Sequence, residues 1–330
     1  MRRVIHTAQA LVDEVLEVPS LPSRGGNVMA STATRLPGGA VTTLVTAARQ
    51  GSSAVHAGAI GTGPNGDLIR AALNADGVRA SAPPIDSHDT GRCVVLVEPS
   101  AERTFVTTLG AERLITRESL ASSDPQPGDV VCVSGYSLIE PTVDALLPWL
   151  ESLPAAAPDD PRGPIEIVLD PGAIFAELPE PIRSRVLAIT TVWTGNADEA
   201  AALGGSGDLD TAPRQVAAHL DDAAAVVVRD GARGCAVHVG GRTRIVRGFP
   251  QTPVDTTGAG DTHTGALCAA MLTTDAPSRD LGDWTAAARY ANAAAAISVT
   301  RRGPASPPGL AEVVQFLVDQ VKAASAASAG

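Results

Sequence analysis

A glycine-rich segment that ends in a carboxylate is the most specific chemical signal in this chain. Residues 255–261 read Asp-Thr-Thr-Gly-Ala-Gly-Asp, and a helix-like stretch follows. The small residues Gly258, Ala259 and Gly260 let the backbone approach an anion, and the free N–H groups of an opening helix point toward it. Asp261 would then act as the general base for a hydroxyl that attacks a phosphoryl group held there. The alternative is a strand-to-helix turn in which Asp261 only caps the helix.

A second group of polar residues opens another predicted helix. Asn196 and Glu199 belong to the sequence Asn-Ala-Asp-Glu, which follows the apolar pair 192–193 and precedes an alanine-rich stretch. By itself this pattern indicates a helix N-terminus with favourable acidic residues. The sharper interpretation is that Asn196 and Glu199 hold phosphate-bound Mg²⁺ through its water shell, because Mg²⁺ keeps most of its waters and uses few protein oxygens.

A glycine turn at residues 61–66 offers a different interpretation. Its sequence, Gly-Thr-Gly-Pro-Asn-Gly, matches G-x-G-x-x-G between a predicted strand and a predicted helix, as in dinucleotide-binding folds. However, Pro64 would stiffen the turn, and the acidic residue expected further on could only be Asp86, in a loop-like segment. A tight strand-to-helix connection explains the turn more economically. An NAD(P)-dependent oxidoreductase rests on this turn alone, and an NAD(P) titration would distinguish it.

Several other chemistries have no matching pattern. The sequence contains no G-x-S-x-G elbow and no GxxxxGK[ST] loop, and its only lysine is Lys322 near the C-terminus. A lysine-dependent P-loop mechanism is therefore excluded. The six histidines show no paired-ligand spacing, and only His263 lies near the predicted site. A lone histidine on a helix is more often a packed residue than a participant, so the pattern assigns His263 no role.

Composition and charge restrict the class of protein and its partners. The chain has 330 residues, of which 44% are hydrophobic and only 3% aromatic, and this suits β-branched strands alternating with alanine-rich helices. A net charge of -11 without a basic patch opposes binding to nucleic acid. Four cysteines without paired spacing are expected to be buried thiols in a reducing compartment. No apolar run is long enough to span a membrane, so we expect a cytoplasmic protein without membrane partners.

Alternating apolar and helical segments predict an α/β fold with a parallel sheet covered on both faces. The apolar runs are residues 54–60, 130–133, 165–169, 192–193 and 225–228. The helical stretches are residues 40–49, 66–75, 142–150, 182–189 and 212–220. Two further pairs of extended segments flank turns, 13–18 with 28–35 and 94–98 with 104–108. Strands of one kind continue throughout the chain, so we expect a single domain over residues 1–330.

Together these residues resemble the ribokinase/PfkB family of carbohydrate kinases, from about residue 5 to about residue 307. The segment 255–261 matches the family motif DTxGAGD, and residues 196–199 match its NxxE motif at the expected place upstream. Similar to the N-terminal motifs of the family are Gly38-Gly39, the glycine turns 58–61 and 65–67, and the Glu-Arg-Thr-Phe segment 102–105. The order of the motifs agrees throughout.

The resemblance implies a fold and an activity. The fold is a three-layer α/β/α sandwich with a mainly parallel central sheet and a small β-sheet lid made by residues 13–36 and 91–109. The activity is ATP-dependent phosphorylation of a hydroxyl, in particular a hydroxymethyl group, of a sugar or sugar-like molecule. Family lids close over the sugar and often carry a dimer contact, so a homodimer through the lid is also implied. Closure excludes water, which would compete as phosphoryl acceptor.

The resemblance also implies roles for individual residues. Gly258, Ala259 and Gly260 form the anion hole, and Asp261 is the base. The residues expected to bind the substrate are Asp13, Gly38, Gly39, Thr43 and Arg103. The residues expected to bind ATP are Asn196, Glu199, Arg229, Gly231, Gly234 and Asn292, with Asn196 and Glu199 organising Mg²⁺. The residues expected around a monovalent cation such as K⁺ are Asp255, Thr257, Ser298, Arg301 and Gly303.

One departure from the family pattern affects the substrate. Thr43 stands where the family usually has Asn, and its shorter side chain offers one hydroxyl in place of an amide. A ribose-like binding pattern therefore does not carry over. A nucleoside kinase of the same fold is an alternative that shares every catalytic residue, although the few aromatic residues disfavour base stacking. A sugar-binding relative without catalysis is disfavoured because Asp261 is intact.

Overall fold

A nine-stranded sheet forms the centre of the computed structural model, which describes residues 2–100, 102–154, 160, 162–273, 280–303 and 306–329. Its strand order is β13-β12-β11-β10-β9-β8-β1-β4-β5. The strands from β11 to β5 in this order pair in parallel, whereas β12 and β13 pair antiparallel. The strands are β1 (Arg3–His6), β4 (Ser53–His56), β5 (Arg79–Ala80), β8 (Val130–Ser134), β9 (Glu166–Asp170), β10 (Val192–Asn196), β11 (Ala225–Arg229), β12 (Gly234–Val239) and β13 (Arg242–Arg247).

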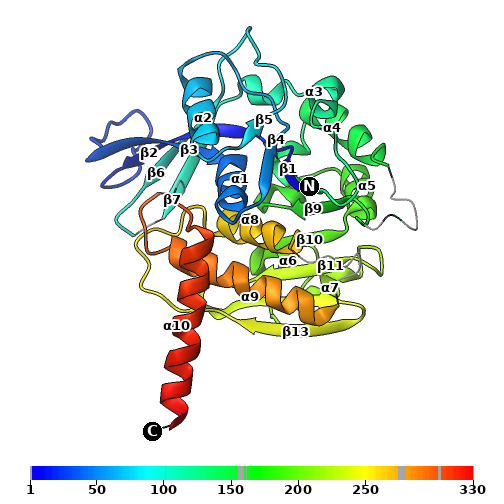
Figure 1. The fold of residues 1–330 in the computed structure, drawn as a ribbon. Coiled ribbons are helices and arrows are strands. Elements are labelled where there is room, and N and C mark those ends of the chain that lie inside the picture. The colour runs from blue at the N-terminus through cyan, green and yellow to red at the C-terminus, as the bar shows by residue number, and fades with distance from the viewer. Residues whose placement is uncertain are drawn as a thin grey trace.

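Helices cover both faces of this sheet (Figure 1), which explains why its strands are apolar runs rather than alternating ones. One hydrophobic core lies between the sheet and α1 (Ala40–Arg49), α2 (Pro64–Ala75), α8 (Ala259–Met271) and α9 (Leu281–Ser298). The other lies beneath α3 (Arg117–Ala121), α4 (Thr142–Glu151), α5 (Glu180–Ile189), α6 (Ala197–Ala202) and α7 (Ala212–Ala217). The predicted three-layer α/β/α sandwich is confirmed.

A second, four-stranded sheet projects from one side of the central sheet (Figure 1). Its order is β3-β2-β6-β7, with β2 and β6 parallel and the outer pairs antiparallel. The strands are β2 (Ala10–Glu17), β3 (Thr32–Gly39), β6 (Arg92–Val97) and β7 (Arg103–Thr107). They include both extended pairs predicted from the sequence, and the predicted lid is confirmed.

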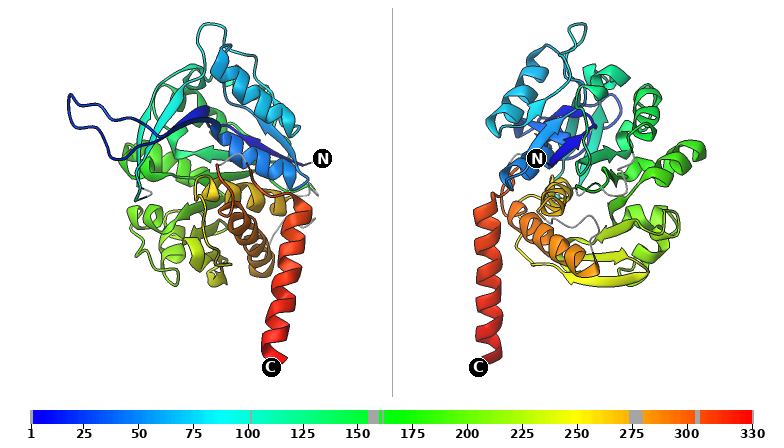
Figure 2. Two further views of the ribbon diagram at one scale, coloured as in Figure 1. Left: turned by 90° about the vertical axis from the view of Figure 1, so that its left-hand side faces the viewer. Right: turned by 45° about the vertical axis from the view of Figure 1, so that its right-hand side comes forward.

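Four short 3₁₀ helices and one long terminal helix complete the described elements. The short helices are η1 (Ala111–Arg113), η2 (Gly135–Ser137), η3 (Ala173–Glu177) and η4 (Gly231–Arg233). The helix α10 (Leu310–Ala329) contacts α9, and the centroid of its Phe316 ring lies 5.4 Å from that of Phe249, in the loop after β13. The helix then extends away from the body (Figure 2). Within the described ranges, no helix combines the length and the apolar character needed to cross a membrane.

Candidate active site

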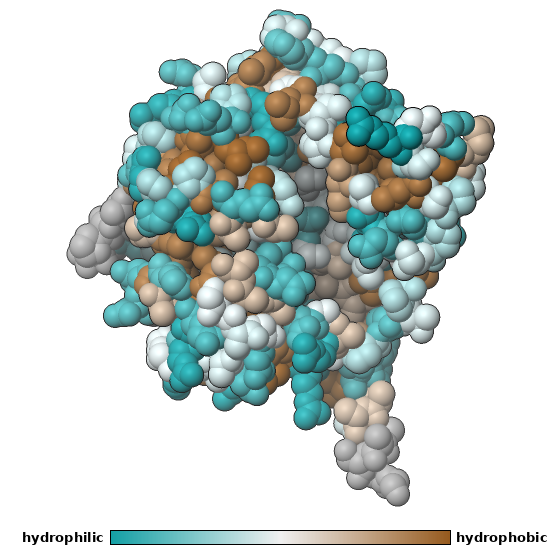
Figure 3. Space-filling view, turned by 180° about the vertical axis from the view of Figure 1, so that it is seen from behind, coloured by the Kyte–Doolittle hydropathy of each residue, from teal (hydrophilic) through white to brown (hydrophobic). Residues whose placement is uncertain are grey.

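The carboxyl ends of five parallel strands meet at one edge of the central sheet, where a cavity of about 560 Å³ opens. The last residues of these strands all line it, namely His6, Ser134, Asp170, Asn196 and Arg229. The lid contributes further walls, and the cleft between lid and body is visible from behind in Figure 3. We call this space the acceptor cavity.

A second cavity of about 420 Å³ lies beside the first, against α8 and α9. Its walls include Gly231 and Gly234, as well as alanine and valine side chains of α9 and its C-terminus. The two cavities share Asn196, Arg229 and Gly260. A molecule in the second cavity could therefore reach a molecule in the acceptor cavity at this junction. We call the second space the nucleotide cavity.

The first turn of α8 lies at the junction and leaves backbone donors free. Gly258, the N-cap residue, has a φ of 73°, which favours glycine, and it turns the chain into the helix. The helix begins at Ala259, whose N–H donates to the Thr256 carbonyl at 3.3 Å, whereas the N–H groups of Gly260 and Asp261 have no partner among the described residues. These N–H groups and the helix dipole together favour an anion at this end. The anion hole of Gly258, Ala259 and Gly260 stays a prediction, and this end of α8 could accept an anion at the N–H groups of Gly260 and Asp261.

Asp261 extends from this turn into the acceptor cavity. Burial raises the pKa of its carboxyl to about 7, and the nearby Asp170, Asp13 and Glu199 carboxylates act in the same direction, while Arg229 opposes them. In the described part of the chain, no hydrogen bond of the Asp261 side chain caps α8. The side chain is therefore poised to exchange a proton near neutral pH.

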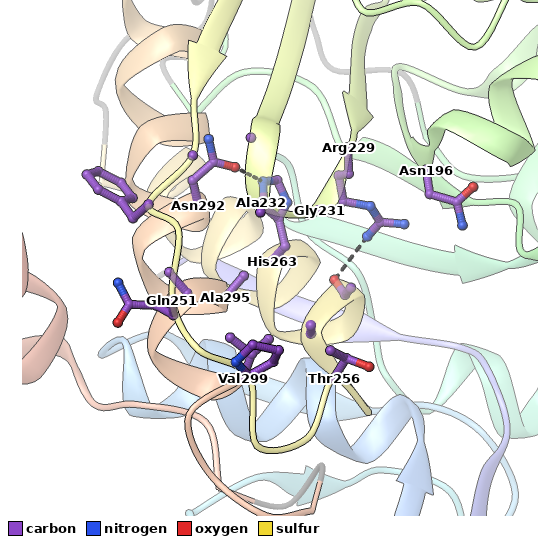
Figure 4. A pocket seen from close by; sticks show the side chains of 17 residues that line it. Asn196, Arg229, Gly231, Ala232, Gln251, Thr256, His263, Asn292, Ala295 and Val299 are labelled. Carbon is purple, nitrogen blue, oxygen red and sulfur yellow. Dashed lines mark hydrogen bonds between the residues drawn. The ribbon is translucent and has the colours of Figure 1, made fainter. Parts of the chain in front are cut away.

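Arg229 holds the junction together. Its Nη1 donates to the carbonyl oxygen of Gly260 at 2.9 Å (Figure 4) and to Oγ1 of Thr264 at 2.8 Å. Its Nη2 donates to Oδ2 of Asp170 at 3.1 Å and lies 3.7 Å from Oε2 of Glu199. Although burial alone would lower the pKa of Arg229, these carboxylates raise it, so the guanidinium stays charged.

Asp170 is a site residue that the sequence analysis missed. It ends β9, lines the acceptor cavity, and accepts hydrogen bonds from Arg229 and from Oγ1 of Thr264 at 3.1 Å. A carboxylate directly after the apolar run 165–169 and before Pro171 was the available signal, because strand ends of parallel sheets gather ligands.

Asn196 and Glu199 form a complete capping box at the start of α6. Oδ1 of Asn196 accepts from the Glu199 N–H at 2.8 Å, and Oε2 of Glu199 accepts from the Asn196 N–H at 2.7 Å. The structural interpretation of this motif therefore holds. Burial raises the pKa of Glu199, and the nearby Asp170 carboxylate raises it further. The Arg229 guanidinium, 3.7 Å away, opposes this rise. Glu199 also lines the acceptor cavity, where its carboxylate can accept a hydrogen bond from Mg²⁺-bound water, so the residues also fit Mg²⁺.

The nucleotide cavity brings His263 and Asn292 into direct contact (Figure 4). Nδ2 of Asn292 donates to the Val246 carbonyl at 3.1 Å, which turns Oδ1 toward Nε2 of His263, also at 3.1 Å. Nε2 therefore carries the proton. Burial, together with the charge of Arg229, lowers the pKa of His263 to about 3. His263 is thus a neutral wall residue that fixes the orientation of Asn292.

The acceptor cavity contains most of the residues predicted to bind substrate. Asp13, Gly39 and Thr43 line it. Gly38 stands behind Asp13, where a Cβ atom at this position would lie only 2.2 Å from Oδ2 of Asp13. Burial raises the pKa of Asp13 to about 6. The Asp13 carboxylate has no hydrogen-bond partner among the described residues, which leaves both oxygens available to substrate hydroxyls.

Arg103 lies outside the residues that line this cavity. Its Nη2 donates to Oδ1 of Asp255 at 3.0 Å, so it joins lid strand β7 to the glycine-rich segment. Oδ1 of Asp255 also accepts from the backbone N–H and the hydroxyl of Thr257, and Oδ2 accepts from the Gly303 N–H at 3.0 Å. Partial burial would raise the pKa of Asp255, but these hydrogen bonds and Arg103 lower it.

The other two residues predicted around a monovalent cation lie near this cluster in the chain but are differently engaged. The backbone N–H of Arg301 donates to the Ser298 carbonyl at 3.0 Å. The guanidinium of Arg301 turns away and binds Glu312 of α10. The structure thus joins Asp255, Thr257 and Gly303 directly.

The glycine turn at residues 61–66 is occupied by another part of the chain. The Asp89 carboxylate accepts from the N–H groups of Asn65 at 3.0 Å and Gly66 at 2.9 Å, at the start of α2. A Cβ atom at Gly63 would lie 2.3 Å from Cγ of Asp89. Asp89 therefore takes the place that a pyrophosphate would need. The structural interpretation of this turn holds, and the oxidoreductase alternative loses its basis.

Comparisons with known proteins show the family of this chain. The chain matches the pfkB family carbohydrate kinase model over residues 1–309. It is 28% identical to the sugar kinase YegV of Escherichia coli over 81% of each chain, and 28% identical to the ribokinase of Haemophilus influenzae over 92% of this chain and 95% of that protein. The chain therefore belongs to the pfkB family of carbohydrate kinases. It is a phosphotransferase that acts on a sugar hydroxyl, and the predicted family and reaction class are confirmed.

A solved structure shows the same fold. Arabidopsis thaliana ribokinase, complexed with ribose and ATP, has a TM-score of 0.76 to this chain at 22% identity. The similarity covers 96% of this chain and 99% of that chain. The central sheet and the lid together thus have the fold of that ribokinase.

Proposed function

We propose that this kinase transfers the γ-phosphoryl group of ATP to a hydroxyl, in particular a hydroxymethyl group, of a sugar-like acceptor, with Asp261 as the general base. The observation that carries the proposal is the position of Asp261 on the acceptor side of the junction between the two cavities. With its pKa raised to about 7, Asp261 can take the proton of the attacking hydroxyl near neutral pH.

The other residues at the junction would stabilise charge and hold the reactants. The free N–H groups of the first turn of α8 face the phosphoryl group as negative charge develops on it. Arg229 fixes this turn through the Gly260 carbonyl, and Gly231, Gly234 and Asn292 form walls for the nucleotide. Lid residues such as Asp13 and Phe105 cover the acceptor and exclude water, which would otherwise take the phosphoryl group.

Mg²⁺ would be held by Asn196 and Glu199 through water, with Asp170 nearby. Among the described residues, no three His, Cys, Asp or Glu side chains converge to hold a metal ion directly. Nucleotide-bound Mg²⁺ takes most of its ligands from phosphate and water, and the Glu199 and Asp170 carboxylates can accept hydrogen bonds from that water. The ion neutralises phosphate charge when it is bound.

The test is a panel of sugars and nucleosides assayed for ADP formation from ATP. A sugar that gives ADP well above the rate with water alone supports the proposal, and nucleosides as sole acceptors would support the nucleoside kinase alternative. If no sugar or nucleoside raises ADP formation, although calorimetry shows that ATP binds, the result would contradict the proposal.

Asp13→Ala is expected to raise KM for the acceptor by about 10- to 100-fold, because the carboxylate would make charge-assisted hydrogen bonds to sugar hydroxyls. KM for ATP should change much less, since Asp13 lines the acceptor cavity but not the nucleotide cavity. The matched control is Glu14→Ala, because Glu14 points to the opposite face of β2 and pairs with Arg92 at 3.2 Å. Equal changes in both KM values would show that Asp13 does not bind the sugar.

We also propose that a monovalent cation binds beside Asp255, with ligands from Thr257 and from the loop that includes Ser298, Arg301 and Gly303. The hydrogen bonds of Asp255 to Thr257 and Gly303 support a common site. Replacing K⁺ by tetramethylammonium, which is too large for a ring of backbone oxygens, is expected to lower kcat. Unchanged kcat would show that the Arg103 guanidinium alone balances Asp255.

A further inference from the structure

Arg113, which the sequence analysis did not single out, places a cation in the wall of the acceptor cavity. It ends η1, just after the last lid strand, and its side chain is buried, with only 9% of the residue exposed. Its Nη1 donates to the Tyr136 carbonyl at 2.9 Å, and its Nε is enclosed without a partner. Among the described residues, Nη2 has no hydrogen-bond partner and no carboxylate lies within ion-pair distance of the guanidinium.

The neighbouring carboxylate does not neutralise this charge. Oε1 of Glu112 accepts from the Gly110 N–H at 2.9 Å, and Oε2 accepts from the Gly91 N–H at 2.6 Å. Glu112 thus joins the residue before β6 to the residue before η1 and forms no ion pair with Arg113. Burial lowers the pKa of Arg113, although the Glu112 charge opposes this, so the surroundings tolerate the cation poorly without a partner.

Arg229, the other arginine that lines this cavity, has its charge balanced by two carboxylates. Arg229 contacts both Asp170 and Glu199. Burying a charge without a counter-charge is unfavourable, so the unpaired guanidinium favours a ligand that brings its own negative charge. The planar fork of arginine matches the paired oxygens of a carboxylate or a phosphate.

A second donor opens into the same cavity. Nδ1 of His6 accepts from the Ala8 N–H at 3.2 Å, so the ring proton must be on Nε2. Nε2 has no hydrogen-bond partner among the described residues, and it is not fully enclosed, so it remains accessible from the cavity. Burial, and then His56, lower the pKa of His6 to about 3, so this donor is neutral. In addition to the Asp13 carboxylate, the cavity therefore presents two donors to the oxygen atoms of a bound molecule. One is the charged guanidinium of Arg113, and the other is the neutral ring of His6.

We propose that the sugar-like acceptor of this kinase carries an anionic oxygen group, a carboxylate or a phosphate, and that Arg113 binds it. The inference rests on the proposed kinase function and specifies its substrate class. The hydroxyl of the same molecule is then presented to Asp261, while the anionic group neutralises the buried guanidinium. Neutral sugars would leave Arg113 uncompensated and bind more weakly.

The experiment compares matched acceptor pairs, gluconate with glucose and ribose 1-phosphate with ribose, in the ADP assay and by calorimetry with the ATP-free protein. The anionic member of at least one pair should have a kcat/KM about 10- to 100-fold above its neutral partner, the range expected for a charge-assisted hydrogen bond. Gluconate as the better acceptor would identify a carboxylate, and ribose 1-phosphate a phosphate.

Variants assign the preference to Arg113. Arg113→Gln should reduce the anionic-to-neutral ratio of kcat/KM by about 10-fold or more, and Arg113→Lys should retain part of it. The matched control is Arg117→Gln, which removes an equal charge from an exposed position four residues further on and should keep the ratio. A thermal melt of each variant identifies loss of folding. If Arg113→Gln does not fold, calorimetry on Arg113→Lys compares the binding of the anionic and neutral compounds in its place.

Two outcomes would overturn the inference and leave the kinase function standing. One is a neutral sugar that is phosphorylated as well as its anionic counterpart. The other is an anionic preference that Arg113→Gln does not reduce. Failure of every acceptor to give ADP would instead count against the proposed function, and calorimetry would still test Arg113. In that case, equal or absent binding of the anionic and neutral compounds by the parent protein would overturn the inference.

Discussion

Asp261→Asn is expected to lower kcat by about 10²- to 10⁴-fold, because it removes the proton acceptor and preserves the size of the side chain. KM for ATP should change little, since Asp261 lines the acceptor cavity but not the nucleotide cavity. In the parent enzyme, kcat/KM should rise with pH through about 7 as Asp261 loses its proton. The residual activity of the variant should lack this rise. Steady-state kinetics between pH 5.5 and pH 9, chosen to span about 1.5 pH units or more on either side of that pKa, measures both effects.

A matched control separates catalysis from helix capping. Asp283 occupies in α9 the position that Asp261 occupies in α8, the third residue of the helix after a glycine. It is a true cap, since its Oδ2 accepts from the Asp280 N–H at 3.1 Å. Asp283→Asn should therefore change stability by about 1 kcal/mol or less and leave kcat unchanged.

Stability provides an independent readout for Asp261. The folded protein binds the Asp261 proton more tightly than the unfolded chain does, because burial raises the pKa from 3.8 to about 7. The stability that the protonated group contributes is present below pH 3.8 and is lost as pH rises through about 7. Asparagine cannot ionise, so the melting temperature of Asp261→Asn at pH 8 should equal or exceed that of the parent. A lower melting temperature together with turnover within a few-fold of the parent would assign Asp261 to the helix alone.

The parts of the fold that were predictable are those with local signals. The apolar runs of the central strands follow from their burial on both faces, and helix 40–49 was predicted with its observed bounds. The predicted strand 54–60 was too long. It ends at His56 because its neighbours in the sheet, β1 and β5, end at His6 and Ala80. Strand ends depend on pairing between distant segments, which no local pattern reports.

The same distinction holds in the site. The segments 255–261 and 196–199 are contiguous motifs and could be found from the sequence, whereas Asp170 and Arg113 are single residues whose role comes from the fold. Arg103 is a further example, because its contact with Asp255 spans 152 residues of chain. Only the sheet topology brings such residues together.

Arg229→Met is expected to lower the free energy of unfolding by about 3 to 5 kcal/mol at pH 8, because it removes the cation that contacts both Asp170 and Glu199. The side chain of Arg229 is only 11% exposed, so water replaces little of the lost interaction. The cost should shrink toward pH 5, where Glu199, whose pKa burial raises, takes up a proton more readily. Urea unfolding at both pH values measures the difference. Arg233→Met is the matched control, because the side chain of Arg233 is 73% exposed and such surface pairs contribute about 0 to 1 kcal/mol.

Kinetics of Arg229→Met tests how the charge reaches the catalytic base. Arg229 lowers the pKa of Asp261 against the opposing effects of burial and Asp170, so its removal should raise that pKa further. The rise of kcat/KM should therefore move to higher pH in the variant, and kcat should fall because the Gly260 carbonyl loses its partner at 2.9 Å. A profile that stays in place while stability falls would mean that Arg229 supports the fold of the junction without tuning Asp261. A shifted profile would instead show that Arg229 keeps Asp261 ionised near neutral pH, where the proposed mechanism requires a free carboxylate.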